Sequence, residues 1–400
     1  MLTTALLSLA LLGPVSPHGN AAEDEASVNW KNKSYSISEL PVSTGPTVAG
    51  TAKVWSDWVL EHDYQMHLST DARVLVISRR KNSAIKRQLK LIDKTSKYFD
   101  KLLPAPKKIE KEAADKPGPT KPSGDGDLPE DPEGGLVGWN EAEPQKEGQT
   151  TWSYEWGAST FERDTETCLV FVAKDMEDYG SILDKLGSLH DYLKPWVPTG
   201  KSLTGFVLER PLAAAYIENV SGQEEWNPNN ELVNRTAQML FLRRFSQLPY
   251  WLVQGLAWHV EWELLEGLYC FPYRGEFVFA AEHTSWPAEL KQRYKSKKPL
   301  TIEMSDFSEW RRGKFKPDPA RVSFGFVSFL AREHKNELSG FAEGLRVFWE
   351  KDNRVDTGGG SWSRKVGYEI SSANQQRMLR EAFGNDVLEK AAKSLAKGKK

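Results

Sequence analysis

The sequence feature that most constrains this chain is a pair of helical patterns between residues 227 and 268 that carry polar residues at fixed spacings. Residues 230–234 read Asn-Glu-Leu-Val-Asn and open an apolar helical run that continues to Arg244. Leu248-Pro249 follows, and proline is favoured in the first turn of a helix. A second helix is therefore predicted from Pro249 to about Leu268. Gln254 in that helix lies 20 positions after Asn234 (254 − 234).

This arrangement has the spacing of a metal site. Side chains at i and i+4 lie on one helical face, so two imidazoles there could bind one metal ion. A residue at i+1 could act on a metal-bound water, and a second helix could supply a carboxylate as the third ligand. Zinc prefers imidazole, thiolate and carboxylate donors, and neutral carboxamides are poor substitutes. We therefore expect no zinc and no other cofactor at Asn230, Asn234 and Gln254.

The pattern resembles that of the gluzincin metallopeptidases, which are thermolysin-like and carry H-E-x-x-H and a third ligand, Glu, further along. Residues 251–257, Trp-Leu-Val-Gln-Gly-Leu-Ala, also look like the W-L-x-E-G-L-A segment of peptidase MA-like families. The resemblance extends over most of residues 60–392. It implies a zincin-like α+β fold, with a small mixed β-sheet and helices followed by a helical C-terminal lobe.

Every expected ligand is replaced in this chain. Asn230 and Asn234 stand at the two histidine positions and Gln254 at the third-ligand position, while Glu231 retains the general-base position and is expected to be idle. The resemblance also implies that the last strand before the motif helix forms the edge of a cleft, flanked by Ala214, Tyr216 and Glu218. The alternative is an ordinary helix start, since asparagine is a good N-cap and glutamate suits the first turn.

The N-terminus has the layout of a secretory signal peptide over residues 1–22, with a short apolar core and small residues before an acidic stretch. We therefore expect a secreted or periplasmic protein, and the mature chain has no further window that is apolar enough to span a membrane.

The remaining chain is predicted in four parts. Residues 23–103 form an N-terminal strand and helix part, and residues 104–150 form a disordered linker or insertion because they are polar and rich in proline and glycine. Residues 151–268 form the peptidase-like core, and residues 269–400 form the helical lobe. Strands are predicted at 64–68, 74–77, 168–172, 203–208 and 213–217, and helices at 85–103, 176–193, 322–332, 341–349, 373–383 and 386–397. Residues 356–360 and most of 270–290 are expected to be loops.

Other site types have less support. The formal net charge is −2, which does not suggest a nucleic-acid partner. No phosphate-binding or nucleophile-elbow motif occurs. Cys168 and Cys270 could form one disulfide or remain buried thiols. His259 and Glu263 could form a displaced metal site with Glu231, or only an i,i+4 ion pair.

The sequence thus predicts an exported pseudopeptidase that has lost zinc and binds a peptide or protein partner in the residual cleft. Two alternatives remain open, namely an active hydrolase with a relocated metal and a structural envelope protein.

Overall fold

The computed structural model describes residues 26–104, 165–218, 227–268, 285–295, 302–310, 317–358, 361–364 and 368–398. The predicted signal peptide, nearly all of the predicted 104–150 linker and Cys270 lie outside these ranges. Across the described helices, none combines the length and the apolar character needed to cross a membrane.

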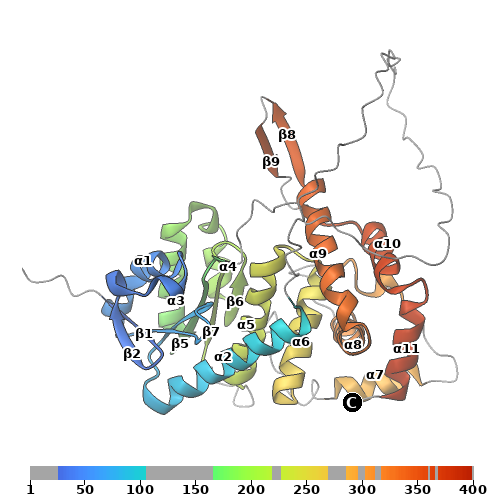
Figure 1. Cartoon of the computed structure of the whole chain (residues 1–400), viewed down its shortest axis with the longest axis horizontal. Coiled ribbons are helices and arrows are strands. Elements are labelled where there is room, and N and C mark those ends of the chain that lie inside the picture. Colours follow the sequence, from blue (N-terminus) through green and yellow to red (C-terminus); the bar gives the residue numbers. More distant parts are fainter. Residues whose placement is uncertain are drawn as a thin grey trace, which may run out of the picture.

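The core is a seven-stranded mixed sheet with the strand order β2-β1-β3-β4-β5-β7-β6 (Figure 1). Strands β4, β5 and β7 are parallel, and β6 pairs antiparallel with β7 at the end of the described sheet. The strands span Ser27–Trp30, Lys33–Ser36, Gln65–Leu68, Val74–Ser78, Cys168–Ala173, Gly205–Leu208 and Ala213–Ile217, in the order β1 to β7. The predicted class, a mixed sheet combined with many helices, is confirmed.

Alternating side chains of the central strands supply two separate cores. Leu75, Phe171 and Ala215 face the core that contains α1 (Val48–Glu61) and α3 (Met176–Leu189). Val76, Val170 and Ala214 face the opposite core, which contains α2 (Asn82–Leu102) and α5 (Pro228–Phe245). Because successive residues of a strand point to opposite faces, these nearly continuous apolar runs are what a sheet covered on both sides requires.

Helix α6 (Tyr250–Leu265) joins the sheet layer to the C-terminal helices, which lie on the far side of α5 and α6 in Figure 1. Gly255 permits a close approach of α6 to α8, because a Cβ placed there would lie 2.6 Å from Val327 Cγ2 and 2.8 Å from the carbonyl oxygen of Ser323. The remaining helices are α4 (Val197–Lys201), α7 (Trp286–Tyr294), α8 (Pro317–Glu333), α9 (Lys335–Asp352), α10 (Ser372–Phe383) and α11 (Val387–Lys397).

Most predicted elements are present with slightly shifted ends, but three predictions need correction. Strand β7 is not the edge strand, because β6 pairs with it along Ala213–Tyr216. Residues 356–358 belong to strand β8 (Arg354–Gly358), which pairs with β9 (Ser361–Arg364) instead of forming a loop. Part of the predicted 270–290 loop, from Trp286 onward, is helix α7.

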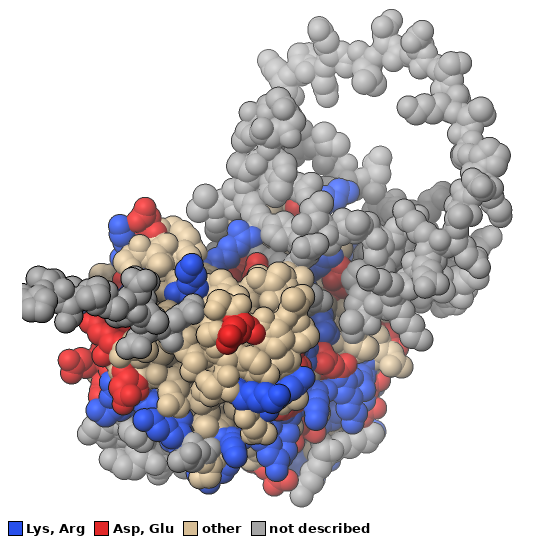
Figure 2. Space-filling view, turned by 60° about the vertical axis from the view of Figure 1, so that its left-hand side comes forward, with Lys and Arg blue, Asp and Glu red and all other residues tan. Residues whose placement is uncertain are grey.

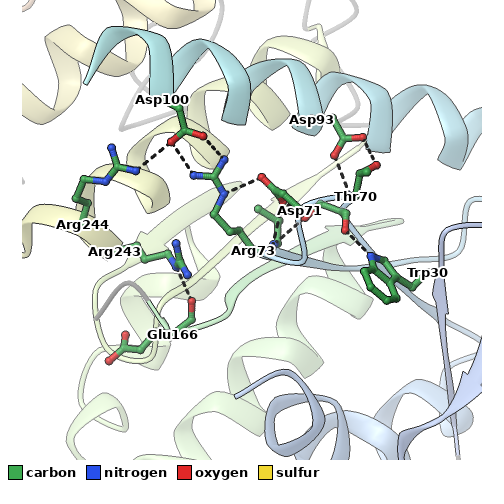
Figure 3. A network of polar contacts seen from close by, with 11 residues as sticks. Trp30, Thr70, Asp71, Arg73, Asp93, Asp100, Glu166, Arg243 and Arg244 are labelled. Carbon is green, nitrogen blue, oxygen red and sulfur yellow. Dashed lines mark hydrogen bonds and ion pairs between the residues drawn. The ribbon is translucent and has the colours of Figure 1, made fainter. Parts of the chain in front are cut away.

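The first turn after β3, helix α2 and the end of α5 are connected by charged side chains (Figure 3). Arg73 donates to both oxygens of Asp100 on α2 at 2.9 and 2.8 Å, and its Nε donates to Asp71 at 2.7 Å. Arg244 at the end of α5 donates to Asp100 Oδ1 at 3.0 Å, and this oxygen also accepts from Arg73 Nη1. We call Asp71, Arg73, Asp100 and Arg244 the Arg–Asp network.

Charged side chains of both signs are distributed over the face shown in Figure 2, among larger areas of other residues. Helix α2 alone presents exposed lysines at 86, 90, 94, 97 and 101, together with exposed Asp100. The exposed side of α2 is therefore mainly basic, and its one exposed carboxylate, Asp100, is paired with Arg73 and Arg244.

Candidate functional site

The motif helix begins where its sequence places it. The side chain of Asn227 accepts a hydrogen bond from the backbone N–H of Asn229 at 3.0 Å, and Pro228 is the first residue of α5. The cap is therefore Asn227, and Asn230 and Asn234 are left to point into the protein. Both are almost completely buried, as is Glu231 between them.

Asn230 and Asn234 both donate to one carboxylate, that of Glu261 on α6. The Nδ2 of Asn230 lies 2.7 Å from Glu261 Oε1, and the Nδ2 of Asn234 lies 2.9 Å from Glu261 Oε2. Asn230 Nδ2 also donates to the carbonyl oxygen of Gly267 at 3.0 Å. Glu261 is fully buried, and these amide hydrogen bonds compensate part of the cost of removing its carboxylate from water.

Gln254, on α6, is connected to Asn234 through Gln238. Its Nε2 donates to Gln238 Oε1 at 3.0 Å, and Gln238 Nε2 in turn donates to Asn234 Oδ1 at 2.6 Å. Two of the three amides therefore donate to Glu261, and the third reaches Asn234 through one further amide.

We call Asn230, Asn234, Gln238, Gln254 and Glu261 the amide–carboxylate network. Sequence reasoning missed Gln238 and Glu261, although both repeat at helical spacing from predicted residues. Gln238 follows Asn234 by one turn, and Glu261 follows Gln254 by two turns. The missing information was the register of the two helices, which places Glu261 rather than Gln254 opposite the two asparagines.

Glu231, at the general-base position, is already paired. Its Oε2 accepts a hydrogen bond from Arg235 Nε at 3.0 Å, and both side chains are buried. The guanidinium of Arg235 lies against strand β6, because a Cβ added to Gly205 would lie 3.0 Å from Arg235 Nη2. The Arg235 side chain therefore lies between the motif helix and β6.

The donor set does not fit zinc. The Nδ2 groups of Asn230 and Asn234 donate hydrogen bonds to Glu261, so they cannot coordinate a cation. Asn234 Oδ1 already accepts from Gln238. Within the described ranges, Asn230 Oδ1 and Gln254 Oε1 are buried without a hydrogen-bond partner, but two neutral amide oxygens are poor ligands for zinc. No catalytic step through a metal follows from these residues.

The displaced site suggested by His259 and Glu263 is also absent from the described part of the chain. His259 is fully buried. Its Nε2 lies 3.0 Å from the Tyr98 hydroxyl oxygen, and its Nδ1 lies 3.2 Å from Ser328 Oγ. Burial lowers the pKa of His259 to about 3. Glu263 pairs with Arg332 at 2.7 Å instead of with His259. No group of three or more His, Cys, Asp or Glu side chains suited to a metal occurs in the residues described.

The predicted cleft residues do not lie at the edge of the described sheet, because β6 pairs with β7. Ala214 and Tyr216 face the core that contains α5 and α6, and both are buried. Glu218 follows β7 and forms an ion pair with Arg80. The described sheet ends at β6 and not at β7. Cys168 on β5 is a buried free thiol, and burial raises its pKa to about 12.

A separate pocket opens where α5 ends and α6 begins. Its volume is about 250 Å³. The walls come from the β6–β7 turn, the α5–α6 connection, α9 and the residues around the start of α10. The described lining residues are Glu209, Leu242, Gln247, Leu248, Pro249, Tyr250, Val253, Ser308, Trp310, Trp349, Tyr368, Glu369, Ile370 and Gln375.

Comparisons with known sequences add no family to this geometry. No protein-family model matches the chain, and no curated protein does so.

Proposed function

We propose that this protein is a catalytically inactive, gluzincin-like metallopeptidase relative that is exported and acts by binding a peptide or protein partner. The observation that supports the proposal is the amide–carboxylate network at the positions where the gluzincin resemblance would place the metal ligands. Asn230 and Asn234 direct their N–H groups at Glu261, and Glu231 is paired with Arg235. Metal-bound histidines donate their second ring N–H to a carboxylate or carbonyl group. Glu261 is a buried carboxylate that faces positions 230 and 234, one helical turn apart, and it would accept from histidines at both.

The sheet supports the zincin-like part of the proposal. Three parallel strands precede the motif helix, and the antiparallel strand β6 ends the described sheet beside α5. Such an edge strand can bind an extended peptide through backbone hydrogen bonds, and that capacity does not require a metal. The signal-peptide layout of residues 1–22 supports export.

The metal test uses the mature protein purified from a zinc-supplemented culture. We expect less than a tenth of a zinc ion per chain by inductively coupled plasma mass spectrometry, and no cleavage of a mixed peptide library. One zinc per chain, together with cleavage that a chelator abolishes, would instead establish the active hydrolase.

The binding test applies the same peptide library, immobilised, to the intact protein. Saturable retention of a subset of peptides without cleavage is the expected result. Failure to retain any peptide would remove the binding role and leave a structural envelope protein as the better account.

A further inference from the structure

Exposed lysines follow one side of helix α2 from its second turn to its end. We call them the lysine row, and its members are Lys86, Lys90, Lys94, Lys97 and Lys101. At about 100° per residue they fall within an arc of about 80°, and they extend for roughly 22 Å along the helix axis. Because the arc is narrow, all of these side chains can reach one flat surface at the same time.

The lysine row is not neutralised by neighbouring carboxylates. Within the described part of the chain, none of its lysines forms an ion pair. Figure 3 shows the two aspartates of α2 directed at other groups. Asp93 accepts hydrogen bonds from the backbone N–H and the hydroxyl of Thr70 at 3.0 and 2.6 Å, and Asp100 is held by Arg73 and Arg244. The positive charge of the row therefore has no paired counter-charge among the residues described.

Helix α11 offers a comparison, because its exposed lysines are paired. Lys390 and Lys393 each form an ion pair with an acidic residue one turn earlier, Asp386 and Glu389. Such i,i+4 ion pairs stabilise a helix, whereas like charges at the same spacing destabilise it. The lysine row contains like charges at i,i+4 throughout most of its length, and an anionic partner would relieve their repulsion.

The composition of the row indicates the class of partner. Lysine is a compact point charge, whereas recognition of base edges uses the forked donors of arginine, asparagine or glutamine. A helix with about four to eight basic residues is typical of binding to anionic lipid headgroups. None of the exposed large apolar side chains in the described ranges lies on α2, so the helix has no apolar group to insert between lipids.

We propose that the lysine row is a peripheral membrane-binding surface that holds the protein on a bilayer containing anionic phospholipids. The opposite side of α2 is buried, with Ile85, Ile92 and Phe99 in the core, and the helix lies across α5 in Figure 1. The row therefore faces outward from the fold. The proposal is independent of the peptide-binding role, since it uses no residue of the amide–carboxylate network or of β6.

The test measures co-sedimentation of the mature protein, without residues 1–22, with vesicles of phosphatidylcholine alone or of phosphatidylcholine with about a third of phosphatidylglycerol. In about 0.1 M sodium chloride we expect binding to the anionic vesicles and none to the neutral ones. In about 0.5 M salt the protein should be released, because screening shortens the range of the attraction. Equal binding to both vesicles, or binding that salt does not reduce, would overturn the proposal.

A triple variant locates the surface. Lys90→Gln, Lys94→Gln and Lys97→Gln together should weaken binding to the anionic vesicles about a hundredfold, which corresponds to about 1 kcal/mol for each lysine. The variant should fold, as judged by circular dichroism, because it removes repulsion between exposed like charges.

The matched control makes the same change of charge away from α2. It combines Lys53→Gln on α1, Lys295→Gln after α7 and Lys351→Gln on α9, all at exposed positions. This control should weaken binding less than about threefold, since charges farther from the bilayer are screened. Equal losses in the two triple variants would mean that net charge and not the row attracts the vesicles, and the assignment would be wrong.

A further arm replaces the vesicles with single-stranded and double-stranded oligonucleotides. If the protein binds either one more tightly than the anionic vesicles, and the α2 variant removes that binding, the partner is a nucleic acid and the proposal is wrong. Loss of vesicle binding would leave retention of peptides unaffected, so the membrane surface and the peptide-binding role fail separately.

Discussion

The amide–carboxylate network and the Arg–Asp network both join α5 to another helix, but they do so with different chemistry. The first contains one carboxylate and four neutral amides, and every member is at most 3% exposed. The second uses two arginines and two aspartates near the surface, and the Asp100 side chain is 46% exposed. Charges that keep contact with water lose little hydration free energy when they pair. A buried carboxylate loses its hydration and therefore requires a hydrogen bond to each oxygen.

The difference indicates what each network is for. Surface ion pairs such as Asp100 with Arg73 and Arg244 contribute modestly and tolerate substitution. A buried carboxylate such as Glu261 is expensive, and an apolar residue would serve packing at least as well. Its presence between Asn230 and Asn234 is explained if the helices once carried a metal site whose ligands it oriented.

The largest expected effect is that of Glu261→Ala, which should lower the free energy of unfolding by about 3–5 kcal/mol. It removes both acceptors of the Asn230 and Asn234 amides and leaves those donors buried. Urea unfolding measures the change. Glu263→Ala on the same helix is the control, because its exposed ion pair with Arg332 should be worth less than about 1 kcal/mol. Similar costs for the two variants would contradict the contrast between buried and surface networks.

Acid should destabilise the fold next most strongly, through His259 on α6 and His67 on β3. Burial lowers the pKa of His259 to about 3 and that of His67 to about 4, both below the ordinary 6.5. The unfolded chain therefore binds more protons than the folded one between these values and pH 6.5, so stability falls as the pH is lowered through that range.

For His259 the loss between pH 7 and pH 4 should be about 2–3 kcal/mol. Urea midpoints taken at each pH give the slope, and His259→Gln should flatten it. A slope that does not change in this variant would mean that His259 is protonated equally well in both states.

The smallest effect is expected from Asp100→Ala, at about 1 kcal/mol, because the side chain is partly exposed and its charge is screened. In 0.5 M sodium chloride the loss should shrink, whereas the loss in Glu261→Ala should persist. Asp57→Ala, at an exposed position of α1, serves as the control. An Asp100→Ala loss that is insensitive to salt would mean that packing, and not charge, dominates the Arg–Asp network.

The sequence predicted local elements well because their patterns are local. The apolar runs of β4, β5 and β7 indicated strands, and the period of α2 indicated an amphipathic helix. The N-terminal region was harder. Trp55 and Trp58 lie on the buried side of α1. The sequence around them is polar in composition, so its helical spacing was not recognised.

The sequence predicted three of the five residues of the amide–carboxylate network, Asn230, Asn234 and Gln254, but not how they pair. Asn230, Glu231 and Asn234 are on the motif helix as expected, and all are buried. Their partners depend on how α5 and α6 are rotated and shifted against each other, which spacing along the chain does not specify. For the same reason the order of β6 and β7 could not be read from the sequence.

The most direct test of the account restores imidazoles to the frame and measures zinc. The double variant Asn230→His with Asn234→His places two histidines opposite Glu261, and the triple variant adds Gln254→Glu. We predict that both fold, as judged by circular dichroism, and that the double variant already binds one zinc ion per chain in a competition titration, while the unaltered protein binds none. Two folded variants that take up no zinc would contradict the claim that α5 and α6 are the frame of a former metal site.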